Sequence, residues 1–88
     1  MMLDTALSLE RFAWHAGRHA DLSVQSLALA SDPAYVSVRN RFSATLAETV
    51  TCSEEGAFVT SWGYRLGTTE DVESAAARLA FLLAALPA

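Results

Sequence analysis

Hydrophobic residues change their spacing twice along this chain. Over Asp4–His15 they recur every three or four positions, as they do on one face of a helix. Over Leu22–Leu66 they tend to alternate with polar residues, which is the period of a strand with one buried face. Helical spacing returns after Gly67-Thr68-Thr69. The pattern therefore predicts a helix, then a sheet, then a second helix.

The first helix is predicted to have Asp4 or Thr5 as its N-cap, because short polar side chains accept hydrogen bonds from the free N–H groups of a first turn. Gly17 is predicted to end it in the left-handed conformation that glycine tolerates. The second helix is predicted to begin after Thr69, with acidic residues in its first turn where they complement the helix dipole. Each helix is predicted to bury one apolar stripe. In the first helix the stripe comprises Leu9, Phe12, Ala13 and Ala16, widened by Leu3, Leu7 and Trp14. In the second helix it comprises Val72, Ala75, Ala76, Leu79, Leu82, Leu83 and Leu86.

Four strands are predicted between the helices, over Leu22–Leu29, Tyr35–Phe42, Leu46–Cys52 and Ala57–Leu66. The first strand slips out of phase, which predicts a bulge around Gln25-Ser26. The second strand alternates, so that Val36, Val38 and Phe42 share the side that we expect to be buried.

The turn between the last two predicted strands sets their register. A three-residue loop ending at Gly56 places Cys52 opposite Phe58 and Glu48 opposite Trp62, so that the apolar sides agree and Trp62 lies in the core. A two-residue loop is the alternative. It would shift the register by one residue and turn Trp62 to the other face. We favour the first register.

Both predicted helices have one apolar face, so the economical packing lays them on the same side of the sheet. The sequence thus predicts a single α+β domain over residues 1–88, with an N-terminal helix, a four-stranded antiparallel meander and a C-terminal helix. The opposite face of the sheet is left open to solvent or to a partner. Its predicted residues are Tyr35, Ser37, Arg39, Arg41, Thr49, Thr51, Ser61 and Arg65.

Composition and charge limit the classes of function. The 88 residues are 52% hydrophobic and 18% charged, which is too apolar for a disordered chain and predicts a folded domain. A domain this short buries a modest core, so a homodimer or a protein partner is expected. The net charge of −4 gives little general attraction to a polyanion, and nucleic-acid binding is therefore unexpected.

Several absences in the sequence bear on the compartment. Cys52 is the single cysteine, so no internal disulfide can form and a reducing environment is indicated. The first residues lack the basic and apolar regions of a signal peptide. The most apolar stretch, residues 75–88, contains Arg78 and is shorter than the roughly 20 residues that span a bilayer. These features predict a cytoplasmic protein with no membrane segment.

The C-terminal half of the chain resembles a group of small, uncharacterised bacterial helix–sheet–helix proteins. The segments that carry the resemblance are ETVTC, SWG, RLG and EDVESAAARLA. In that group an E-T-V-x-C strand precedes a W-x-x-x-W-G strand and a helix containing D-D-V-x-x-A-A. This chain has residues 57–61, AFVTS, in place of the denser aromatic run of the group. The resemblance implies the fold and no activity.

Residues with potential chemistry have plainer structural explanations. His15 and His19 have the four-residue spacing of a zinc pair, but Gly17 lies between them and Asp21 is the only nearby carboxylate downstream, so we expect no metal and no cofactor. Cys52 is in phase with a buried strand side and is expected to be a small core residue.

Glu48 is the anomaly of the pattern, because it falls among apolar positions. A carboxylate there is costly unless it is paired, so Glu48 is expected either to reach water at the end of the sheet or to be held by an arginine or by Trp62 Nε1–H. Tyr64 is expected at the rim of the core. A role for Glu48 as a general acid or base is the less favoured alternative, and we expect no catalytic residues.

Arg39, Arg41 and Arg65 form the one predicted concentration of positive charge on an acidic chain. Together with Tyr35 they are the predicted binding residues, for an acidic or phosphorylated partner or a dimer contact. The sequence thus favours a non-catalytic protein-interaction module. One alternative is a ligand-binding protein or enzyme with a pocket between helices and sheet, using Glu48, Tyr64 or a histidine. The other is an RNA-binding sheet, which the net charge disfavours.

Overall fold

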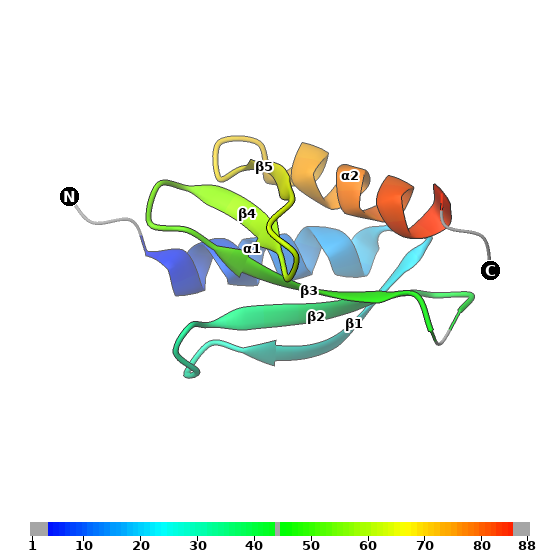
Figure 1. The fold of residues 1–88 in the computed structure, drawn as a ribbon, viewed down its shortest axis with the longest axis horizontal. Helices are drawn as coiled ribbons and strands as arrows, with labels where there is room; N and C mark the ends of the chain where they lie inside the picture. The colour runs from blue at the N-terminus through cyan, green and yellow to red at the C-terminus, as the bar shows by residue number, and fades with distance from the viewer. Residues whose placement is uncertain (1–3, 44, 86–88) are drawn as a thin grey trace.

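Two helices lie against one face of a five-stranded antiparallel sheet in the computed structural model, which describes residues 4–43 and 45–85 (Figure 1). The strands follow one another in the sheet in the order β1-β2-β3-β4-β5. The α+β class and the antiparallel meander are therefore confirmed, while the predicted number of strands is wrong. The elements are α1 (Thr5–Arg18), β1 (Leu22–Ala28), β2 (Tyr35–Asn40), β3 (Ala47–Cys52), β4 (Ala57–Thr60), β5 (Arg65–Thr68) and α2 (Val72–Ala85).

The additional strand arises because the predicted strand Ala57–Leu66 is a hairpin. A tight turn joins β4 to β5, with Gly63 N–H donating to the Thr60 carbonyl at 3.0 Å and Thr60 N–H donating to the Tyr64 carbonyl at 2.9 Å. Gly63 has a φ of 89°, in the region that glycine adopts without strain. Alternation continues on both sides of this turn, so the hydrophobic pattern alone does not separate the two strands.

Buried residues of both helices and of the sheet form one core. Leu9, Phe12 and Ala16 of α1 pack with the stripe of α2, and the ring centroids of Phe12 and Phe58 lie 4.9 Å apart. The strand residues of this core share one face of the sheet, which confirms that both helices cover the same side. They are Leu22, Val36, Val38, Val50, Phe58 and Leu66. The α2 residues are Val72, Ala75, Ala76, Leu79, Ala80 and Leu83, and the predicted stripe residue Leu86 lies outside the described part of the chain.

The strand register follows the sequence prediction at two places. Cys52 lies opposite Phe58, as the favoured loop required. The pairing of β1 with β2 shifts between Val24 and Ser26, which confirms the predicted bulge. Two predictions about side-chain burial near strand ends are wrong. Phe42 is 78% exposed because β2 ends at Asn40, and Trp62 is 63% exposed because it lies in the β4–β5 turn.

The helix ends are decided by side-chain caps. Asp4 accepts a hydrogen bond from Leu7 N–H at 3.0 Å, as predicted for an N-cap, and Asp71 accepts one from Ser74 N–H at 3.1 Å before α2. Gly17 does not end α1. The helix continues to Arg18 and its cap residue is His19, with a φ of −76°. Neither helix of the described chain has the length and apolar character needed to cross a bilayer.

Candidate functional site

The hydrogen-bonded ladder between β3 and β4 stops after three residue pairs. These pairs are Val50–Thr60, Thr51–Val59 and Cys52–Phe58. The same register would next bring the backbone of Thr49 to that of Ser61. The Glu48 side chain takes that place instead, since one of its oxygens, Oε1, accepts hydrogen bonds from Thr49 N–H at 2.8 Å and from Ser61 N–H at 3.0 Å. The carboxylate thus bridges the two strands where they separate.

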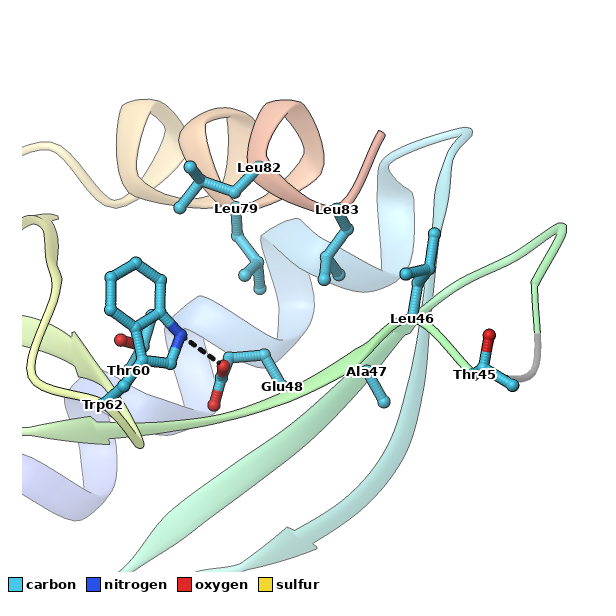
Figure 2. Close-up of a pocket in the computed structure, with 9 residues that line it drawn as sticks. All are labelled: Thr45, Leu46, Ala47, Glu48, Thr60, Trp62, Leu79, Leu82 and Leu83. Atoms are coloured by element: carbon cyan, nitrogen blue, oxygen red, sulfur yellow. Dashed lines mark hydrogen bonds between the residues drawn. The ribbon is translucent and has the colours of Figure 1, made fainter. Parts of the chain in front are cut away.

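Glu48 receives further hydrogen bonds from the β4–β5 turn. The Ser61 hydroxyl donates to Oε1 at 2.5 Å, and Trp62 Nε1–H donates to Oε2 at 2.7 Å (Figure 2). Burial alone raises the pKa of Glu48, but the hydrogen bonds from Ser61, Thr49 and Trp62 outweigh it and hold the pKa below its ordinary value. All four donors are neutral groups. Glu48 is therefore an ionised carboxylate whose charge these contacts leave uncompensated, and the contact with Trp62 confirms one of the two arrangements predicted for it.

A groove opens beside this carboxylate, between α2 and the start of β3. Its cavity has a volume of about 220 Å³. In Figure 2, leucines of α2 form one wall, the opening residues of β3 face them, and the indole of Trp62 closes one end with its nitrogen directed at Glu48. The lining residues are Thr45, Leu46, Ala47, Glu48, Thr60, Trp62, Leu79, Leu82 and Leu83.

Aromatic contacts hold the Trp62 end of the groove in place. The rings of Trp62 and Tyr64 lie 5.1 Å apart between centroids, and Arg78 Nη1 donates to the Tyr64 hydroxyl at 3.1 Å. Tyr64 is half-buried, which agrees with its predicted place at the rim. The contacts that run from Glu48 through Trp62 and Tyr64 to Arg78 therefore connect the β4–β5 turn to both β3 and α2.

The pKa shifts of Glu48 and Cys52 limit the chemistry that each side chain can perform. An ionised carboxylate with a lowered pKa is a weak general base and holds no proton to donate at neutral pH. Cys52 is half-buried beside the core, and burial raises the pKa of its thiol against a smaller opposing effect of a Ser8 hydrogen bond, which disfavours the nucleophilic thiolate. Within residues 4–43 and 45–85, no three His, Cys, Asp or Glu side chains are arranged to hold a metal ion.

The predicted arginine face is dispersed over the sheet. Arg39 lies beside Ser23 and Ala47, whereas Arg65 lies on β5, three strands away, which is about 14 Å across the sheet. Tyr35 is at the other end of β2 from Arg39. Arg41 follows the end of β2, and its guanidinium donates to the Leu22 carbonyl at 2.9 Å. The structure therefore brings Arg39 and Arg41 near the same end of β2 and leaves Arg65 apart from them.

The hydrophobic pattern assigns the leucines of the groove and Trp62 to the core. Leu79, Leu82 and Leu83 fit the buried stripe of the second helix, and periodicity does not show that Leu82 is left partly uncovered. The sequence carries two signals of this site: Glu48 in an apolar position, and Gly63 inside a predicted strand, where glycine often marks a bend.

Comparison with known proteins gives no relative for this chain. A scan against family models, a search of curated proteins and a search of solved structures each returned no match.

Proposed function

We propose that this protein is a non-catalytic interaction module and that a partner protein docks in the groove between α2 and β3. The observation that carries the proposal is Trp62, a large aromatic residue that stays 63% exposed at the end of an apolar groove. Exposed aromatic side chains next to apolar clefts are typical anchors of protein interfaces. The hydrogen bond to Glu48 and the contact with Tyr64 hold this side chain in position before any partner arrives.

The size of the groove favours a protein partner over a small molecule. Pockets for drug-sized ligands and cofactors enclose roughly 300–1,000 Å³, and most of the ligand is buried in them. A cavity of about 220 Å³ accommodates one or two side chains of a larger partner. Ligand binding or catalysis in this groove is the weaker proposal, since the polar groups of its described lining side chains are Glu48, the Trp62 indole N–H that it already binds, and two threonine hydroxyls.

We also propose a homodimeric, cytoplasmic protein. The outer side of α2 supports self-association, because Phe81 is 71% exposed there between the exposed residues Ala77 and Ala84. Sedimentation of the purified chain over a range of concentrations tests the dimer. A mass of two chains for the wild type and of one chain for Phe81→Ser is expected, and a monomeric wild type at the highest concentration would refute it.

The docking proposal is tested by capture from an extract of the native cell with two matched variants. Trp62→Ala removes the anchor, whereas Trp14→Ala removes another exposed tryptophan, on α1, which does not line the groove. We expect stoichiometric partners of the wild type to be retained by Trp14→Ala and lost by Trp62→Ala. Retention of every partner by Trp62→Ala would remove the groove from the function.

A further inference from the structure

Within residues 4–43 and 45–85, an edge of β3 beside the groove lacks a neighbouring strand. Asn40 N–H donates to the Leu46 carbonyl at 2.7 Å, so the backbone of Leu46 faces β2. Backbone groups alternate in direction along a strand, and those of Ala47 therefore face the opposite side, where Thr51 further along pairs with Val59. The ladder with β4 begins at Val50. Ala47 thus presents one N–H and one carbonyl to the groove rather than to a strand of the described chain.

The Glu48 bridge is the reason that this edge stays open. By bonding the N–H groups of both Thr49 and Ser61, its carboxylate replaces the next rung of the ladder and turns the chain away into the β4–β5 turn. The position that a longer β4 would fill is occupied by the groove. A strand placed there would continue the sheet beside β3.

The wall opposite this edge is apolar. Leu79, Leu82 and Leu83 of α2 line the groove, together with Leu46. Because side chains of a strand alternate between its two faces, a segment added beside β3 would direct every second side chain toward these leucines. A medium-sized apolar side chain matches the cavity of about 220 Å³.

The charge in the groove is negative. Among the described residues its lining includes Glu48 and no arginine, and the four donors to Glu48 are neutral. Oxygen Oε2 accepts its hydrogen bond from Trp62, so it retains capacity for a second donor. The exposed indole beside it is a favourable surface for a cation. A basic side chain is therefore the complementary group.

We propose that the groove binds an extended, basic segment of a partner protein. The segment adds as a strand beside β3 at Ala47, places an apolar side chain against Leu82, and brings a lysine or arginine to Glu48. Main-chain hydrogen bonds to an open sheet edge provide affinity in this mode, and alternate side chains provide specificity. The proposal rests on the groove being the docking site.

A second copy of the chain is a poorer occupant than a different protein. The outer strands of the sheet are β1 and β5. Over Leu22–Ala28, β1 contains no basic residue, and in β5 the apolar residue next to Arg65 is Leu66, which is buried in its own core. Neither outer strand offers an accessible apolar side chain together with a basic one.

A random-peptide library displayed on phage tests the recognition mode. It is selected on the wild type and counter-selected on Leu82→Asp, so that groove binders are enriched. We expect enriched peptides to alternate apolar and polar residues and to carry a lysine or arginine. Affinity of a synthetic peptide is then followed by Trp62 fluorescence in the Trp14→Phe background, where Trp62 is the single tryptophan.

Changes on the peptide side keep the test independent of protein folding. Replacing the basic residue by norleucine is expected to weaken binding about tenfold in wild type and to have little effect in Glu48→Gln. Methylation of the backbone nitrogen that meets Ala47 is expected to weaken binding by a similar factor, whereas methylation of the next nitrogen is its control.

Two outcomes would overturn the inference. Enriched peptides without basic residues, bound equally by Glu48→Gln and insensitive to backbone methylation, would show a groove that takes side chains without a strand. The inference would also be overturned if the library yielded no peptide that binds the wild type and Leu82→Asp with different affinities. In either case, the docking proposal would still stand if the capture experiment finds partners that require Trp62. If it finds no such partners, the docking proposal fails too.

Discussion

At the scale of single residues, Glu48 determines where the β3–β4 ladder ends. A glutamate on the core-facing side of a strand would be costly if it lacked partners. Here three backbone or side-chain donors and the Trp62 indole satisfy it. The same contacts fix the turn that keeps Trp62 outside the core, so one side chain accounts both for the open edge and for the exposed anchor.

The pKa of Glu48 predicts how stability depends on pH. Because its pKa in the folded state lies below the ordinary value of 4.5, the ionised group stabilises the fold above about pH 4.5, and this contribution is lost as the pH falls through the lower folded pKa. Glu48→Gln should therefore have a smaller free energy of unfolding than wild type at pH 7, by about 1 kcal/mol. Urea unfolding at a series of pH values should show the difference narrowing below pH 4.5. A constant difference down to pH 3 would contradict this assignment.

The exposure of Trp62 predicts a small effect of its removal on stability. Trp62→Ala loses one exposed hydrogen bond and a ring contact, and we expect a cost of about 1 kcal/mol in the free energy of unfolding. Phe58→Ala, which empties a fully buried site, should cost about 3–5 kcal/mol. Urea unfolding of both variants measures the contrast. Equal costs would place Trp62 in the core after all.

At the scale of elements, the β4–β5 hairpin and α2 are joined by close approach of their backbones. A Cβ atom at Gly67 of β5 would lie 3.0 Å from Ala75 Cβ and 3.3 Å from Ala75 Cα. Ala75 is fully buried, and its backbone belongs to a helix that cannot move away cheaply. Gly67 is therefore required by packing between a strand and a helix, and not by its own backbone angles.

This close approach predicts opposite effects of the same substitution at two glycines. Gly67→Ala should reduce the free energy of unfolding by about 1–3 kcal/mol because it overfills the contact with Ala75. Gly17→Ala should increase it by about 0.5–1 kcal/mol, since Gly17 lies inside α1 with its nearest neighbour, Val24 Cγ2, at 4.0 Å. Thermal unfolding of the two variants tests the pair. A destabilised Gly17→Ala would mean that this glycine has a backbone role in ending the helix.

At the scale of the whole molecule, the open sheet face and the groove are separate surfaces. Arg39 and Arg65 occupy strand positions on the side of the sheet opposite the helices, whereas the groove lies between the sheet and α2. The groove has a defined cavity and a fixed aromatic residue, and the arginines are spread over several strands. Binding through the open face remains a prediction, for Tyr35, Arg39, Arg41 and Arg65. A variant of the three arginines can test it separately from binding in the groove.

Replacing Arg39, Arg41 and Arg65 together by glutamine distinguishes the two surfaces. We expect the free energy of unfolding to change by no more than about 1 kcal/mol per residue, because Arg41 and Arg65 are exposed and Arg39 is half-buried, and charges at the surface contribute little to stability. Partners that dock in the groove should still be captured by this variant and be lost only by Trp62→Ala. Loss of the same partners from the arginine variant at low salt would instead assign the docking to the open face.

The α+β class, the order of most elements and much of the strand register can be predicted from the amino-acid sequence. Periodicity located both helices and the first three strands, and a single glycine in the loop was enough to place Cys52 opposite Phe58. These features are local: a repeat of apolar positions or a short loop constrains the backbone within a few residues. The residue Glu48 was also recognisable as an exception to the pattern.

Which apolar residues are covered depends instead on how the elements pack in the folded protein. Trp62, Phe42 and Leu82 fit the apolar phase, but their burial depends on where a strand stops and on what lies opposite, and two of them are largely exposed. The groove exists because contacts of Glu48 with residues 13 and 14 positions later divert the chain. Periodicity reports the side on which a residue lies, whereas a long-range contact decides whether anything covers that side.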